Sequence, residues 1–429
     1  MNRLILTLIL LVNSLRFIGL ESAPPGYYVD EAVGSAQVIC LKQTGSDLFN
    51  SKLPLFSPGL GAGYYTAPYL YGSALWTSIF GDSIAAFRSF AAFITCLTIA
   101  LIYLWMKRKT NTRIALIAAL LASVSPWAFQ FSRIAWDPPL APFFMMLGLN
   151  LFESRKKWNW IAGTLAFALA SYSYPASRIQ MAPLLFLIPG MDWKRKLKSF
   201  VLYLTLLLPL LVRPLTDPRF TLRAKMLVLW SDHPMNPHHD AGLVELTIAF
   251  LKNMALHFTP DFLLMTGDRN LRHSIQSAGM MSVAEWMILV SALLIFIWKL
   301  FRFQKPTLDR IVLFLSAGVL LGIAPAALTW ESVPHALRAI GAWPFFILLA
   351  AWLFEKLNLK QTKICTTALV IITLLFSTRY LVNYFFEYPQ IAANWFQTEH
   401  NPLGKAYEQM TKQGISCKTL QEEMKNGSL

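Results

Sequence analysis

The sequence predicts an all-α membrane protein whose chain crosses the bilayer about eleven times. Hydrophobic residues make up 55% of the 429 residues and charged residues only 14%, whereas an ordinary soluble domain carries about a quarter charged residues. Apolar runs recur along nearly the whole length, which favours one membrane domain over several soluble ones. The net charge of +15 does not indicate nucleic acid, because the basic residues form short clusters between apolar runs.

The apolar runs are interpreted as membrane spans. They fall near residues 4–20, 84–106, 114–131, 138–152, 158–174, 178–190, 199–216, 284–300, 311–329, 336–354 and 364–384. Several are shorter than the roughly 20 residues of a straight crossing, so their boundaries are approximate. The first run follows Arg3 and has the look of a signal peptide, but no small-residue cleavage site follows it convincingly. We expect it to remain as the first span.

The short connections alternate in charge. Basic residues gather at 107–113, 155–157, 194–198, 299–310 and 356–363, whereas the intervening loops carry one arginine each: Arg133, Arg178 and Arg338. The positive-inside rule places the basic set in the cytoplasm, so the N-terminus lies inside and the C-terminus outside. We expect a multi-pass protein of a bacterial inner membrane, with the long loops 21–83 and 217–283 on the outer face.

The four cysteines show neither metal spacing nor a disulfide framework. Cys96 and Cys365 lie in or beside apolar runs, where we expect them to pack as small apolar residues. Cys40 and Cys417 both fall outside the cytoplasm in this topology, and a bond between them is an open option.

Two adjacent carboxylates follow the first span, in Tyr27-Tyr28-Val29-Asp30-Glu31. A carboxylate at a membrane surface beside aromatic residues could act as a general base. Asp30 also suits the N-cap of a helix over 32–43, where its charge would favour the helix dipole. Further along this loop, Pro and Gly separate short pieces, and tyrosines with Trp76 indicate an interfacial helix.

A second acidic residue, Asp137, lies in the loop Ser132-Arg133-Ile134-Ala135-Trp136-Asp137-Pro138-Pro139. Its position before proline is typical of an N-cap followed by the first residue of a helix. A role in a site is the alternative, with the carboxylate orienting an acceptor or balancing an arginine.

These features together resemble the GT-C glycosyltransferases. The resemblance lies in the Asp30-Glu31 pair after the first span, the two interfacial helices, and Gly81-Asp82-Ser83 with Arg88 opening the second span. More narrowly, the chain resembles the protein O-mannosyltransferase and aminoarabinose-transferase group, similar to glycosyltransferase family 39, over roughly residues 1–385. The resemblance implies a GT-C bundle of transmembrane helices, with residues 1–384 as catalytic domain and 385–429 as a short outer tail.

The resemblance also implies an activity. Members transfer a sugar from a polyprenyl-phosphate-linked donor to an acceptor outside the cytoplasm, and the acceptor here could be a lipid, a glycan or a protein. It implies Asp30 as the catalytic base, Glu31 in support and Asp137 as a second acidic site residue. Group members often carry a further outer domain, whereas only about 45 residues follow the last span here, which leaves the substrate class open.

A departing polyprenyl phosphate develops negative charge, which arginine stabilises best. The candidate ligands for the lipid phosphate or the sugar are Arg88, Arg133, Arg272, His273, His335 and Arg338. Taken singly, an arginine at a membrane surface more often extends to the lipid head groups. Segments 267–274 and 331–338 resemble outer-loop motifs of the family, as does 171–178, to which we give no role beyond a pocket wall.

We expect neither a cofactor nor a metal. The histidine-rich stretch 232–240 has no standard ligand spacing and is interpreted as a solvated loop. Two other functions stay open. A transporter or flippase of lipid-linked sugars would need internal repeats and ionisable groups within spans, and we find neither. A membrane scaffold without catalytic activity would have no need of Asp30.

Overall fold

The computed structural model is built almost wholly of helices, and it describes residues 2–59, 63–154, 156, 158–301, 309–356, 362–397 and 402–425. Parts of the predicted cytoplasmic clusters, residues 155, 157, 302–308 and 357–361, lie outside these described residues.

A helix lies at each predicted span. In chain order these are α1 (Asn2–Ser14), α4 (Ile84–Lys109), α5 (Thr112–Val124) with α6 (Pro126–Phe131), α7 (Leu140–Phe152), α8 (Asn159–Ser173), α9 (Pro175–Leu187), α10 (Trp193–Leu206) with α11 (Leu208–Thr216), α14 (Val283–Phe301), α15 (Arg310–Ala327), α16 (Trp343–Lys356) and α17 (Thr362–Val382). The fold class is therefore helical, as predicted.

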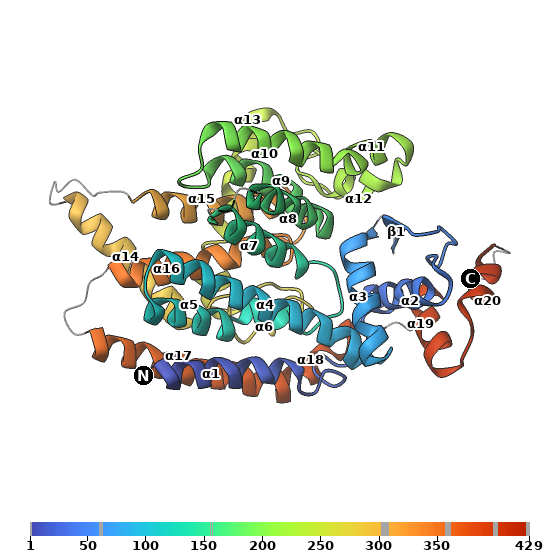
Figure 1. Ribbon diagram of the computed structural model, residues 1–429, viewed down its shortest axis with the longest axis horizontal. Coiled ribbons are helices and arrows are strands. Elements are labelled where there is room, and N and C mark those ends of the chain that lie inside the picture. The colour runs from blue at the N-terminus through green and yellow to red at the C-terminus, as the bar shows by residue number, and fades with distance from the viewer. Residues whose placement is uncertain are drawn as a thin grey trace.

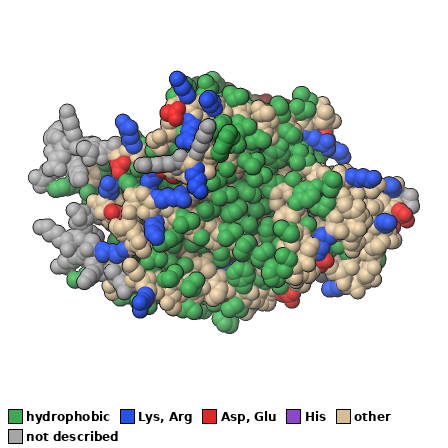
Figure 2. Space-filling view, viewed as in Figure 1, with side chains coloured by type: hydrophobic (Ala, Val, Ile, Leu, Met, Phe, Trp, Pro, Cys, Tyr) green, Lys and Arg blue, Asp and Glu red, His purple; other side chains and the backbone are tan. Residues whose placement is uncertain are grey.

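Four helical stretches of the described chain are long and apolar enough to cross a membrane. They are Ile84–Lys109, Trp193–Thr216, Arg310–Ala327 and Ile364–Trp395. Three more apolar helices, Thr112–Val124, Leu140–Phe152 and Val283–Trp298, are shorter. Figure 2 shows hydrophobic side chains over the middle of the visible face and Lys and Arg mostly toward its margins, as expected of a surface that meets lipid. The number of crossings, about eleven, stays a prediction.

The centre of the bundle is α5. Every residue from Ile114 to Val124 is buried, because α5 packs against α1, α4 and α16. A helix that is apolar on all sides is stable only when neighbours cover all of them. The remaining helices are arranged around this core, with α7 against α4 and α8.

The first outer loop contains α2 (Val29–Thr44), a hairpin of β1 (Phe56–Pro58) and β2 (Tyr64–Thr66), and α3 (Ala67–Phe80). Both predicted helices of this loop are present. The hairpin was not predicted, because its strands are only three residues long. Figure 1 places α2, α3 and β1 at one end of the molecule, opposite the N-terminus.

The long outer loop contains α12 (Arg219–Leu227), α13 (Leu243–Leu256) and one π-helical turn, Asp261–Met265. The sequence of residues 241–256 has an amphipathic pattern that predicts the second of these helices. Figure 1 shows α11, α12 and α13 together along one side of the bundle.

The chain after α17 continues as a π-helical turn (Asn383–Glu387), α18 (Tyr388–Ala392) and a 3₁₀ turn (Ala393–Trp395), followed by α19 (Pro402–Lys412) and α20 (Cys417–Lys425). Both terminal helices contact α2 (Figure 1). A disulfide joins Cys40 of α2 to Cys417 of α20, with the Cα atoms 5.2 Å apart. The structure thus contains the bond that the sequence left open, and it places both cysteines in one compartment.

Candidate active site

Capping of α2 separates the roles of the two adjacent acidic residues. The N-cap is Tyr28, and its backbone N–H donates to the Glu31 carboxylate at 3.1 Å. Glu31 therefore caps the helix, so the interpretation of Asp30 as the N-cap is wrong. Asp30 lies in the first turn, where the helix dipole favours its ionised form and capping does not occupy its side chain.

Glu31 forms a buried ion pair with Arg88 of α4. Both side chains are 0% exposed, and the Arg88 Nε and Nη2 atoms donate to the two Glu31 oxygens at 2.8 Å. Arg88 also donates to the carbonyls of Leu20, Pro24 and Gly26, so all five of its N–H groups are used. Arg88 therefore has no donor left for a phosphate, and Glu31 is a positioning residue. We revise both predicted roles on this ground.

Arg133 has a similar structural role. Its buried guanidinium donates to backbone carbonyls between Leu15 and Ala23, including those of Arg16 and Ile18. Arg16 in turn donates to the carbonyls of residues 123 and 128. The two arginines hold the turn after α1, and with it the start of α2, so Arg133 is also revised from a substrate ligand to a positioning residue.

Asp30 is part of a chain of polar contacts that includes Arg272. The Tyr28 side chain lies close enough to the Asp30 carboxyl to lower its pKa, and Arg272 Nη1 donates to the Tyr28 hydroxyl at 3.1 Å. The Arg272 guanidinium also stacks on the Tyr28 ring, 3.9 Å from its centroid. Tyr65 fixes the backbone by donating to the Asp30 carbonyl at 2.5 Å. The structure thus brings two predicted site residues, Arg272 and Asp30, together through Tyr28. The only feature of the sequence that indicated Tyr28 was its position two residues before Asp30.

Burial raises the pKa of the Asp30 carboxyl, while the nearby Tyr28 side chain and the charges of Arg223 and Arg272 oppose this shift. Burial, with a smaller contribution from the nearby Asp30 carboxylate, raises the pKa of Asp137 to about 7. Asp137 does not cap α7, whose N-cap is Pro139. Two electrostatically coupled carboxylates with raised pKa values are suited to proton transfer near neutral pH.

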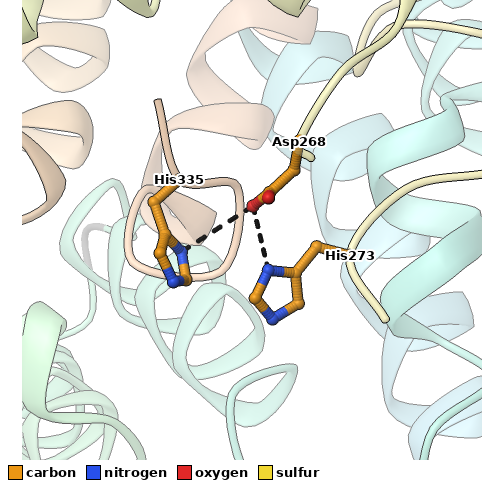
Figure 3. Close-up of side chains that lie close together, drawn as sticks. All are labelled: Asp268, His273 and His335. Atoms are coloured by element: carbon orange, nitrogen blue, oxygen red, sulfur yellow. Dashed lines mark hydrogen bonds and ion pairs between the residues drawn. The ribbon is translucent and has the colours of Figure 1, made fainter. Parts of the chain in front are cut away.

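Asp268, His273 and His335 form a second buried cluster and point toward one another from separate segments (Figure 3). The Asp268 Oδ2 atom lies 2.9 Å from His273 Nδ1 and 3.8 Å from His335 Nδ1. It also accepts a hydrogen bond from the Ala336 N–H at 2.8 Å. Asp268, which the sequence did not single out, therefore joins the 267–274 segment to the 331–338 segment.

The two histidines in this cluster differ in their hydrogen bonds. His335 Nδ1 accepts from the Arg338 N–H at 3.2 Å, and burial lowers the pKa of His335 well below its usual value, so this ring is neutral. His257 Nε2 accepts from the His335 N–H at 3.1 Å. Arg338 itself donates through Nη1 to Thr329 and to the Glu331 carbonyl, and its Nη2 atom lies 3.5 Å from the Glu331 carboxylate, so Arg338 is paired within the 329–338 turn.

The same three residues are the set of described side chains that could hold a metal ion, with ligand atoms within 4.8 Å of one another. A zinc ion lies about 2 Å from each ligand, so these atoms would have to move closer around it. The contacts present are those of a hydrogen-bond network between two loops. The histidines of 232–240 are not part of this cluster; His239 there pairs with Asp240, whose side chain is 88% exposed.

Comparisons with known proteins bear on this arrangement. Residues 68–215 match the family model described as dolichyl-phosphate-mannose-protein mannosyltransferase. No curated protein sequence matches the chain significantly. The resemblance to membrane glycosyltransferases is thus found independently in the sequence of α3 to α11.

The chain also aligns with solved structures of membrane enzymes. ArnT from Cupriavidus metallidurans bound to undecaprenyl phosphate aligns with a TM-score of 0.51 and 13% identity, covering 97% of this chain and 77% of that one. The Archaeoglobus fulgidus oligosaccharyltransferase in the apo form aligns at 0.47 with 12% identity, covering 91% of this chain. This chain spans only 56% of that enzyme's length. A further structure of it, AglB with an inhibitory peptide and a dolichol-phosphate, aligns at 0.47 with 14% identity, covering 94% and 59%. The alignment with ArnT shows that the two chains share a fold, in agreement with the helical bundle that the resemblance implied.

Proposed function

We propose that this protein is an integral membrane glycosyltransferase that transfers a sugar from a polyprenyl-phosphate-linked donor to an acceptor on the extracytoplasmic face. The observation that carries the proposal is the environment of Asp30. Its carboxylate does not cap α2, lies near Tyr28 and the charge of Arg272, and is electrostatically coupled to Asp137.

The reaction is an inverting displacement. The Asp30 carboxylate removes the proton from an acceptor hydroxyl or amine, and the acceptor oxygen or nitrogen bonds to the anomeric carbon of the sugar. The bond from that carbon to the phosphate oxygen breaks, and its electron pair leaves with the polyprenyl phosphate. A base whose pKa lies nearer the working pH transfers protons more effectively, which fits the direction of the shift at Asp30.

The fold and the family match support this reaction. The match over residues 68–215 is to a mannosyltransferase family, and the ArnT structure with which the fold aligns holds undecaprenyl phosphate. The disulfide between Cys40 and Cys417 favours an oxidising compartment for α2 and the tail, in agreement with a catalytic loop outside the cytoplasm. The experiment below is designed to identify the sugar and the acceptor, whether lipid, glycan or protein.

The test compares a strain lacking the gene with the same strain carrying wild-type protein, Asp30→Asn or Asp240→Asn. Mass spectrometry of envelope lipids, glycans and proteins should show a sugar adduct that depends on the wild-type gene. Asp30→Asn should abolish the adduct while inserting normally. Asp240→Asn, the same change at an exposed outer-loop carboxylate, should retain it.

Full transfer by an inserted Asp30→Asn protein would overturn the base assignment. Movement of a sugar lipid from one leaflet to the other in vesicles that contain wild-type protein, without any glycosylated product, would favour the flippase alternative.

A further inference from the structure

α12 (Arg219–Leu227) is held at both ends above the Asp30 region. At its start, Asp217 accepts hydrogen bonds from the Tyr64 hydroxyl of β2 at 2.7 Å and from Arg219 Nε at 3.0 Å. At its end, the Leu227 carbonyl accepts from the Trp330 N–H at 3.1 Å. The helix therefore connects the first outer loop to the turn that carries His335 and Arg338.

Phe220 anchors the first turn of α12 over Arg178. Its ring lies 5.1 Å from that of Phe56 and 5.0 Å from that of Tyr64, and the Arg178 guanidinium lies 5.4 Å from the Phe220 ring centroid. Arg178 Nε donates to the Ser171 carbonyl at 3.3 Å. Its Nη1 and Nη2 atoms form no hydrogen bond or ion pair with any residue that the structure describes.

Arg223 lies one helical turn after Phe220, so the two side chains share a face of α12. Within the described ranges its guanidinium also forms neither a hydrogen bond nor an ion pair. Its charge nevertheless lowers the pKa values of Asp30, Asp137 and His335. The charge of Arg223 thus acts on groups from different segments, in keeping with the place of α12 between β2 and the turn that carries His335.

This environment contrasts with that of three other arginines around the site. Arg88 and Arg133 are saturated by carboxylate and carbonyl oxygens, and Arg338 serves its own turn. Arg178 and Arg223 instead offer guanidinium donors near Asp137 and Asp30 without pairing with them. Planar guanidinium groups bind phosphate oxygens through paired hydrogen bonds.

The geometry of an inverting displacement separates the base from the leaving phosphate. In an inverting displacement the acceptor and the leaving phosphate lie on opposite sides of the sugar ring, so the phosphate ligands cannot touch the base. Arg178 and Arg223 meet this requirement, because their charges influence the carboxylates but they form no ion pair with them.

We propose that Arg178 and Arg223 bind the phosphate of the lipid-linked donor, with α12 positioning Arg223 over the sugar. This assignment rests on the proposed function and moves the phosphate site toward α9 and α12, away from the predicted Arg338.

The experiment measures binding of undecaprenyl phosphate to the purified full chain in nanodiscs by native mass spectrometry, with undecaprenol as the lipid that lacks phosphate. Arg178→Gln and Arg223→Gln should each weaken binding of the phosphate lipid about tenfold or more, as expected for charge-assisted hydrogen bonds, and leave undecaprenol unaffected. Lys225→Gln, which removes an exposed cation from the opposite side of α12, should bind like wild type. Arg223→Lys should recover part of the affinity, which shows that a lost charge and not a lost fold caused the defect.

Wild-type affinity in both glutamine variants would overturn this inference and leave the proposed transfer reaction standing. Absence of phosphate-dependent binding in the wild type would overturn the donor class of the proposed function as well. A third result would also overturn the inference. If both lipids bind with equal affinity and millimolar inorganic phosphate displaces them, the arginines bind a free anion.

Discussion

The carboxylate of Glu31 and the guanidinium of Arg88 face each other in a doubly hydrogen-bonded pair, with both contacts at 2.8 Å and neither side chain exposed. The Glu31 Oε1 atom also accepts from the Ala135 N–H at 2.7 Å. The pair thus connects α2, α4 and the loop that bears Asp137. Glu31, which we do not propose to act on substrate, therefore holds in place Asp30 and Asp137, which we do.

Removing one partner of this pair should destabilise the protein strongly. Glu31→Gln or Arg88→Met leaves a buried charge without its partner, which costs about 3–5 kcal/mol. We expect a clear fall in melting temperature in detergent, measured by intrinsic fluorescence. Glu408→Gln breaks the exposed pair with Lys412 and should cost less than about 1 kcal/mol. Equal melting temperatures for all three variants would contradict a structural role for the pair.

The pH dependence of transfer should report the environment of Asp30. Burial raises its pKa, whereas Tyr28, Arg223 and Arg272 lower it and Glu31 raises it. A base must be ionised, so activity should fall as pH drops through this raised pKa, above the usual range of a carboxyl. Tyr28→Phe removes an interaction that lowers the pKa, so the acid limb of the rate profile should move to still higher pH. Tyr71→Phe, on the surface of α3, should leave the limb in place; a limb that moves to lower pH in Tyr28→Phe would refute the assignment.

Asp137 should make stability depend on pH around neutrality. Its folded pKa of about 7 lies above its ordinary value of 3.8, so the folded state holds the proton more tightly. Stability from this group is present at low pH and declines as pH rises through about 7. Asp137→Asn cannot ionise, so its melting temperature relative to wild type should be higher at pH 8 than at pH 5. The control, Asp240→Asn, should have a melting temperature that follows pH in the same way as that of wild type. The same parallel trend in Asp137→Asn would count against the raised pKa.

The bond between Cys40 and Cys417 should stabilise the outer end of the molecule. Cys417→Ser removes it and should lower stability by about 2–4 kcal/mol, seen as a lower melting temperature and earlier proteolysis within α19 and α20. Peptide mapping without reductant should recover the two cysteines as one linked species. Cys365→Ser, at a free cysteine, should behave as wild type. Alkylation of Cys40 in the unreduced native protein would disprove the bond.

Sequence patterns predicted the elements whose signal is local. Apolar runs located the helices, and the patterns of the outer loops located α2, α3 and α13, because composition and periodicity are local properties. The tail helices α19 and α20 were missed for the same reason. They are short, and α2 supplies the surface against which they are stable.

The roles of the arginines could not be predicted in this way. Arg88 and Arg272 look alike in sequence, yet one is saturated by Glu31 and three carbonyls while the other reaches Tyr28. Their partners lie dozens to hundreds of positions away, so only the fold distinguishes a structural guanidinium from an available one. Arg223 was missed because its neighbours in sequence carry no motif, and its charge acts on groups from other loops.

The linkage from Cys40 to Cys417 also has a consequence for biogenesis. A sequence separation of 377 residues means that the first sulfur emerges long before its partner. The cysteines synthesised in between, Cys96 and Cys365, lie on apolar helices, where they are poorly placed to capture it. The bond can close only after all the intervening helices have been inserted and both ends have reached the same side. A closed disulfide therefore marks a correctly threaded chain, and an exposed Cys40 thiol marks one that quality-control factors could still intercept.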